Sequence, residues 1–191
     1  MSSTDDAIVK AAKFELRVDY NQFNVHRPEE YDTVLEFMRT SLADLGQDGE
    51  NLVIGGVDAV VVGTGVSTGR VAIDVECRTN APSPVAPRDL AAWEDVAEVS
   101  FESTDGEMWL HGADQLYDSE LGTLTPRGPG PYRLRVLARG RTVSWDSVPD
   151  DIVERYQLII WPSHPTVRAV YQHRDRLTGR IVSGEAPTSP S

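Results

Sequence analysis

Several short segments of this chain alternate apolar and polar residues, which is the period of a β-strand with one buried face. The segment RVAIDVECR, residues 70–78, shows the alternation most regularly. Its inward-facing residues are expected to be Val71, Ile73, Val75 and Cys77. About 7–9 such segments, separated by Gly, Pro and Asp turn signals, predict a mostly β protein built as an antiparallel β-sandwich.

One segment has helical periodicity instead. Over residues 28–45 the apolar side chains recur every three or four positions, and Gly46 follows as a stop signal. We therefore expect one helix in the N-terminal half, packed on the sheet through its apolar stripe.

The domain organisation follows from length and composition. A chain of 191 residues fits one domain. We expect a flexible N-terminus over residues 1–12, a single β-sandwich domain over residues 13–182 and a disordered, polar tail over residues 183–191. No segment has the length and apolar character of a signal peptide or a membrane span, so the expected location is cytoplasmic.

The segment KFELRVDYNQFNV, residues 13–25, changes the phase of its alternation midway. Apolar side chains occupy even positions up to Tyr20 and odd positions at Phe23 and Val25. A bulge or bend at Asn21 and Gln22 would let the two parts face different regions of the core, as in a strand that passes between sheets.

Charge is distributed unevenly along the chain. Residues 1–126 contain 24 acidic and 8 basic residues, whereas residues 127–191 contain 6 acidic and 10 basic residues. The stretch from Asp89 to Pro126 contains no Lys or Arg. Such an acidic surface would repel phosphate backbones and attract a basic protein, although acidic loops also serve solubility alone. The pattern does not indicate a role for the basic segment 127–180.

The sequence contains no complete motif for a nucleotide, a metal ion or another cofactor. The glycines of VVVGTGVSTGR resemble a phosphate loop, but the strand 70–78 follows them where a helix is required, so a flexible hairpin loop is expected. The four histidines and the single cysteine have no ligand spacing, and Asp114, Asp118 and Glu120 lack the pattern of a calcium loop. We expect no metal and no cofactor, and Cys77 is expected to be a buried, inert thiol.

No catalytic motif is present either, so enzymatic activity is not expected. The four tryptophans could line a sugar-binding face, but Trp161 follows an apolar run and is expected to belong to the core.

The segment FELRVDYNQFNV resembles the N-terminal strand of the competence protein J family, the inhibitors of the DNA-entry nuclease. The positions that carry this resemblance are Glu15, Leu16, Tyr20, Gln22, Phe23 and Val25. The segments VSFESTDGEMWLHG and LTPRGPGPYRLRV are similar to later parts of that family, so the resemblance covers residues 14–139. It implies a small, non-enzymatic protein that binds and blocks a nuclease.

The expected function is therefore that of an inhibitor or immunity-type protein whose acidic surface binds a basic partner such as a nuclease. The expected contact residues are Glu98, Glu102, Asp105 and Glu107 on a hairpin, and Asp114, Asp118 and Glu120 on the loop after it. A structural or adaptor protein, and a small-ligand or carbohydrate-binding sandwich, are the alternatives. Direct binding to nucleic acid or membrane is not expected, and the sequence does not indicate the oligomeric state.

Overall fold

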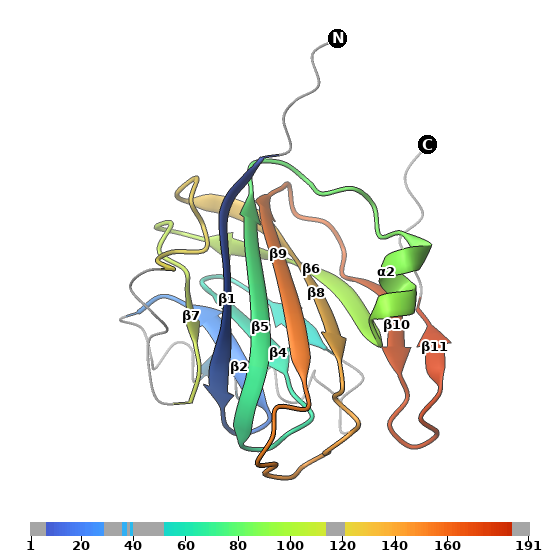
Figure 1. Ribbon diagram of the computed structural model, residues 1–191. Coiled ribbons are helices and arrows are strands. Elements are labelled where there is room, and N and C mark those ends of the chain that lie inside the picture. The colour runs from blue at the N-terminus through green and yellow to red at the C-terminus, as the bar shows by residue number, and fades with distance from the viewer. Residues whose placement is uncertain (1–6, 29–35, 38, 40–51, 114–120, 185–191) are drawn as a thin grey trace.

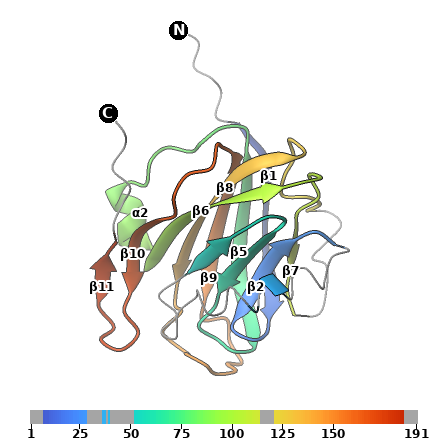
Figure 2. The ribbon, with the colours of Figure 1, turned by 180° about the vertical axis from the view of Figure 1, so that it is seen from behind.

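The computed structural model describes residues 7–28, 36, 37, 39, 52–113 and 121–184. Two β-sheets form its two layers (Figures 1 and 2), which confirms the predicted mostly β class. The larger sheet contains β1 (Ile8–Val18), β5 (Gly69–Arg78), β6 (Asp95–Ser103), β8 (Gly130–Arg139), β9 (Arg155–Pro162), β10 (Ala169–Arg174) and β11 (Ile181–Ser183). The smaller sheet contains β2 (Gln22–His26), β3 (Val53–Gly55), β4 (Ala59–Gly63) and β7 (Trp109–His111).

The larger sheet is mixed. Its strand order is β1-β5-β9-β8-β6-β10-β11, and all neighbours are antiparallel except β5 and β9, which run parallel with Ile73 opposite Tyr156. The prediction of an antiparallel sandwich was wrong for this pair. Parallel neighbours require a long crossover connection, and here the chain between β5 and β9 includes β6 and β8 of the same sheet. The smaller sheet has the order β3-β4-β2-β7.

The phase change in residues 13–25 marks the passage of the chain from one sheet to the other. β1 ends at Val18 in the larger sheet, and β2 begins at Gln22 in the smaller one. The passage is a tight turn rather than a bulge or bend, with φ of 52° at Tyr20 and 57° at Asn21. Two successive left-handed residues reverse the direction of the chain, so the apolar side chains of β1 before the turn and of β2 after it both reach the core.

The main core lies between the sheets. The alternate residues of β5 predicted to face inward are all buried: Val71, Ile73, Val75 and Cys77. Phe23 of the smaller sheet meets Tyr156 of the larger sheet edge to face, with ring centroids 5.2 Å apart. Burial of each such side chain stabilises the fold by about 1.5–3 kcal/mol.

A second apolar cluster lies on the outer face of the larger sheet. Its buried members are Val96, Leu137, Ile159 and Trp161. The connection that contains α2 (Pro87–Ala92) covers them with Val85, Leu90 and Trp93. Figure 1 shows α2 beside β10. The prediction that Trp161 belongs to the core is confirmed, since the residue is 4% exposed.

Part of the N-terminal segment that was expected to be flexible is a strand. β1 begins at Ile8, so the expected flexible N-terminus does not include residues 8–12.

The helix expected over residues 28–45 lies almost wholly outside the described residues; positions 36, 37 and 39 are described and are helical. Near the C-terminus, β10 and β11 form an antiparallel pair with His173 opposite Val182. None of the described helices could span a membrane.

Candidate functional site

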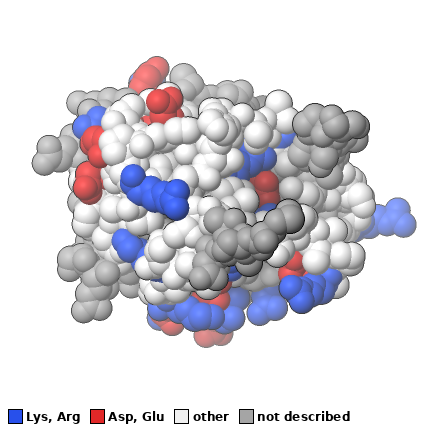
Figure 3. Space-filling model, turned by 90° about the horizontal axis from the view of Figure 1, so that it is seen from above, with Lys and Arg blue, Asp and Glu red and all other residues white. Residues whose placement is uncertain are grey.

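The acidic stretch from Asp89 to Pro126 is compensated in three dimensions by arginines from the basic part of the chain. Glu94 Oε1 lies 3.0 Å from Arg174 Nη2. Asp95 Oδ1 lies 3.4 Å from Arg141 Nη1, and both of these side chains are buried. The face in Figure 3, which is seen from above relative to Figure 1, also carries acidic and basic side chains together. The uneven charge along the sequence is thus partly neutralised by internal ion pairs.

Glu98 occupies a structural position. Its strand β6 pairs with β8, which places Glu98 opposite Arg135. Glu98 is 7% exposed, with Oε1 2.6 Å from Arg135 Nε and Oε2 3.3 Å from Arg133 Nε. The expectation that Glu98 contacts a partner is corrected, because a buried carboxylate between two arginines does not reach the surface.

The exposed acidic residues of this region lie where β6 ends and in the turn that follows. We call residues 102–107 the acidic turn; its exposed carboxylates are Glu102, Asp105 and Glu107. The expected hairpin does not form, because β6 and β7 belong to different sheets and the acidic turn joins them. Only Gly106 has a positive φ, of 84°, whereas the primed hairpin turn needs a left-handed residue at its first central position or at both.

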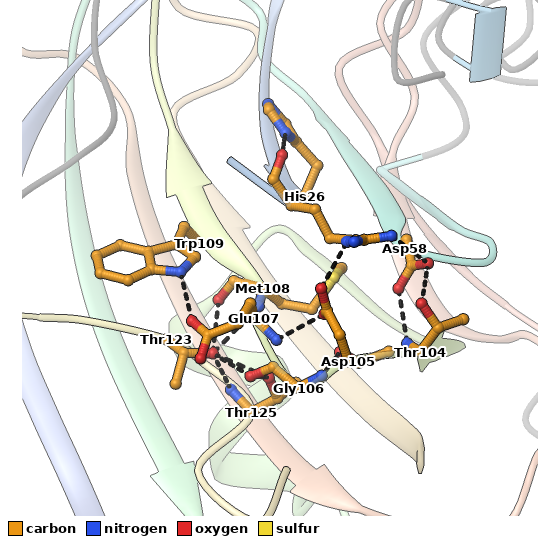
Figure 4. Close-up of polar contacts among 12 residues, drawn as sticks. His26, Asp58, Thr104, Asp105, Gly106, Glu107, Met108, Trp109, Thr123 and Thr125 are labelled. Carbon is orange, nitrogen blue, oxygen red and sulfur yellow. Dashed lines mark hydrogen bonds and ion pairs between the residues drawn. The ribbon is translucent and has the colours of Figure 1, made fainter. Parts of the chain in front are cut away.

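Hydrogen bonds from distant segments fix the acidic turn (Figure 4). The amide and hydroxyl of Thr104 donate to the Asp58 carboxylate at 2.7 and 2.5 Å. The carbonyl of Gly106 accepts the hydroxyls of Thr123 and Thr125 at 2.8 and 2.6 Å. The acidic turn therefore presents its carboxylates from a defined backbone.

The carboxylates of the acidic turn differ in their neighbours. Asp105 Oδ2 lies 2.7 Å from Arg27 Nε, and Asp58 Oδ2 lies 3.8 Å from Arg27 Nη1. Glu107 accepts the indole N–H of Trp109 at 3.0 Å, a neutral donor. Arg27 thus offsets the negative charge of Asp105, whereas the neutral indole N–H of Trp109 leaves the negative charge of Glu107 in place.

The other three expected contact residues, Asp114, Asp118 and Glu120, lie outside the described residues and stay predictions. Among the residues with described positions, no group of three or more His, Cys, Asp or Glu side chains is arranged to hold a metal ion.

A pair of stacked histidines lies on the paired strands β2 and β7, where His111 is opposite Asn24 and His26 is opposite Trp109. The rings of His26 and His111 are nearly parallel, at 9°, with centroids 3.5 Å apart. His26 Nδ1 lies 2.6 Å from the carbonyl of Arg27, the residue that reaches the acidic turn. Burial lowers the pKa of both rings, that of His111 to about 4, so both are neutral at pH 7. Parallel rings direct their lone pairs in parallel planes, which does not suit a shared metal ion.

The glycine loop between β4 and β5 is fixed by an internal carboxylate. The amides of Gly65 and Val66 donate to Glu154 at 3.1 and 2.5 Å, and the hydroxyl of Tyr156 donates to it at 2.5 Å. Glu154 is 1% exposed and stands where a phosphate loop would hold its anion. The loop joins the two sheets, so the expectation of a flexible hairpin loop was wrong.

The tryptophans do not form a common face. Trp161 is buried, Trp93 lies under Arg139, and Trp145 lies under Arg176. Trp109 is half-buried and bound to Glu107. This arrangement disfavours the alternative of a carbohydrate-binding sandwich, which needs exposed rings on one surface.

Comparison with known proteins gives two solved structures. No protein-family model matches the sequence, and no curated protein matches it. The chain is similar to a protein described as "Crocagin biosynthetic gene J", with 15% identity, a TM-score of 0.47, and coverage of 81% of this chain and 98% of that one. It is also similar to ComJ from Bacillus subtilis, described as an inhibitor of the DNA-degrading activity of NucA, with 16% identity, a TM-score of 0.49, and coverage of 82% and 100%. The family that the sequence resembles is that of the second structure.

Proposed function

We propose that this chain is a non-enzymatic protein-binding module that blocks a basic partner, such as a nuclease, through the acidic turn. One observation carries the proposal. Glu102 and Glu107 are exposed and form no ion pair with a described residue, on a turn held by hydrogen bonds from distant segments. A surface fixed before binding loses little conformational freedom when the complex forms, which favours affinity.

The partner class follows from charge. A nuclease must neutralise the phosphates of its substrate with Lys and Arg side chains, and fixed carboxylates can occupy the same basic groove. Asp105 contributes when a basic side chain of the partner competes with Arg27, which lies 2.7 Å away. The resemblance of residues 14–139 to the competence protein J family implies the same class of partner, and we place the complex in the cytoplasm.

The test is capture followed by an activity measurement. The tagged full chain would be exposed to an extract of its source cells, washed, and eluted with 1 M NaCl. We expect the eluate to degrade DNA and the purified chain to inhibit that degradation again after the salt is removed. The double variant Glu102→Lys/Glu107→Lys should capture at least tenfold less of this activity.

A matched control uses the same change of charge at another place. Glu15 and Asp74 lie on β1 and β5 and pair with Arg70 and Lys13, so Glu15→Lys/Asp74→Lys alters the charge equally but leaves the acidic turn intact. The control should capture the activity like the parent chain. Equal capture by the acidic-turn variant would remove the proposed mechanism, and recovery of a large assembly without nuclease or toxin would support the adaptor alternative.

A further inference from the structure

Three connections meet at the end of the sandwich opposite the acidic turn. They are the β1–β2 turn at residues 19–21, the β4–β5 loop at residues 64–68 and the β8–β9 connection at residues 140–154. Figures 1 and 2 both show them at the lower end of the sheets. Ser103, within the acidic turn, pairs with Gly130, the first residue of β8, whereas residues 140–154 follow Arg139, the last residue of β8. The ten residues of β8 separate the two surfaces by about 30 Å.

Backbone hydrogen bonds join the three connections into one unit. The amide of Asn21 donates to the carbonyl of Ser67 at 3.1 Å, and the amide of Ser67 donates to the carbonyl of Ser147 at 3.0 Å. The amide of Asp146 donates to the carbonyl of Gly65 at 2.8 Å. The surface of this end is therefore organised before any partner binds, which lowers the entropy lost in binding.

This unit exposes apolar side chains to solvent. Tyr20 is 80% exposed and Val148 is 68% exposed. Tyr20 also has a φ of 52°, a conformation that bulky residues rarely adopt and that commonly marks a functional position. An exposed tyrosine on a backbone fixed by hydrogen bonds is among the side chains that contribute most to protein interfaces.

The charges around these apolar side chains identify the kind of partner. Asp146, Asp150 and Asp151 are exposed and form no ion pair with any described residue. Two basic side chains near them are engaged: Arg70 pairs with Glu15 at 2.8 Å, and the Arg176 guanidinium lies 4.3 Å from the ring centroid of Trp145. Exposed apolar side chains and unpaired carboxylates on hydrogen-bonded connections complement a surface with an apolar pocket surrounded by Lys and Arg.

We infer that this end is a second protein-binding surface, on which Tyr20 and Val148 enter an apolar pocket of a basic protein and the three aspartates bind its Lys and Arg side chains. The inference goes beyond the proposed function, because it assigns a separate surface and does not depend on the partner being a nuclease.

The test selects binders from a phage-displayed library of random 12-residue peptides on the immobilised full chain. We expect enriched peptides that combine an aromatic or aliphatic residue with flanking Lys or Arg. Their affinity should fall at least tenfold for Tyr20→Asn and at least threefold for Val148→Ser. Asn accepts the left-handed backbone of position 20, so Tyr20→Asn tests the side chain without disturbing the turn.

The control is Val167→Ser, because Val167 is 72% exposed and lies outside the three connections; it should bind the peptides like the parent chain. Two results would overturn the inference: no enrichment of basic peptides, or peptides that bind Tyr20→Asn as tightly as the parent. Peptides that lose affinity only for Glu102→Lys/Glu107→Lys would belong to the acidic turn and would also overturn it. The capture of nuclease activity is measured separately, so either surface can fail without the other.

Discussion

His26 and His111 stack ring on ring, with centroids 3.5 Å apart, although 85 residues separate them in the chain. Both rings are buried, and burial lowers the pKa of each below the ordinary value of 6.5, that of His111 to about 4. The folded state therefore favours the neutral form of both rings.

The first prediction is a loss of stability in mild acid. Because the folded rings bind protons more weakly than unfolded histidines, the unfolded state takes up protons first as the pH falls. The free energy of unfolding should be insensitive to these groups above about pH 6.5 and should fall by up to about 1.4 kcal/mol per pH unit for each ring below that pH, for His111 down to about pH 4. Urea unfolding between pH 4.5 and 8 measures this slope.

His111→Phe is the matched variant, because it keeps a flat ring and removes the proton-binding site. The pKa of the Asp95 and Glu154 carboxyls is raised by burial, and these groups affect both proteins alike. The difference between the parent chain and His111→Phe in the pH dependence of the free energy of unfolding is therefore the contribution of His111. Identical slopes would show that the stack does not govern the response.

The second prediction separates two glutamates of one strand. Glu98 and Glu102 project from the same face of β6, but Glu98 lies buried between Arg133 and Arg135. Glu98→Gln leaves two buried guanidinium groups without their carboxylate and should lower the free energy of unfolding by about 3 kcal/mol. Glu102→Gln should change it by less than about 0.5 kcal/mol. Chemical unfolding of both variants measures the two changes in the free energy of unfolding. Equal changes would contradict the structural assignment of Glu98.

The same pair of residues shows what could be predicted from the sequence. The alternation along β5 and the phase change before Phe23 were sufficient to predict buried faces and a passage between sheets, because the period of a strand is a local property. The burial of Glu98 depends on Arg133 and Arg135 of β8, which lie 35 and 37 residues away in the chain.

The candidate site was predictable only in part for the same reason. The acidic residues of the acidic turn are visible in the sequence, but the groups that hold it come from elsewhere. Thr104 and Asp58 are 46 residues apart, and Thr123 lies 17 residues from Gly106. Pairings over such distances follow from strand order, and the parallel pair β5 and β9 has no local signal either.

The third prediction concerns Glu154. Its buried carboxylate accepts hydrogen bonds from two backbone amides and the Tyr156 hydroxyl. In Glu154→Gln one carboxylate oxygen becomes an NH2 group, which is itself a donor and cannot accept these hydrogen bonds. We expect a loss of about 2 kcal/mol in the free energy of unfolding and faster hydrogen exchange at Gly65 and Val66. Glu15→Gln, at an exposed position, is the control and should change neither. Unaltered exchange in Glu154→Gln would show that the loop is held by other contacts.

The fourth prediction uses the only thiol. Cys77 is fully buried, and burial raises the pKa of its thiol to about 12. It should react with a disulfide reagent only when the chain unfolds, so the rate should follow the unfolding rate and be independent of reagent at high concentration. The chain in guanidinium chloride supplies the reference for an accessible thiol. Reaction of the folded chain at that reference rate would contradict the buried position.

The last prediction is that Tyr20 lowers stability where it stands. The side chain is 80% exposed, so its removal loses little packing, while its backbone has a φ of 52°. Asn adopts this left-handed conformation more readily than Tyr, and Tyr20→Asn should raise the free energy of unfolding by about 0.5 kcal/mol. Tyr20→Ala removes the same ring without that backbone preference and should not gain stability. If Tyr20→Asn is no more stable than Tyr20→Ala, the turn is unstrained. If Tyr20→Asn is more stable and also loses peptide binding, Tyr20 lowers the stability of the fold but contributes to recognition.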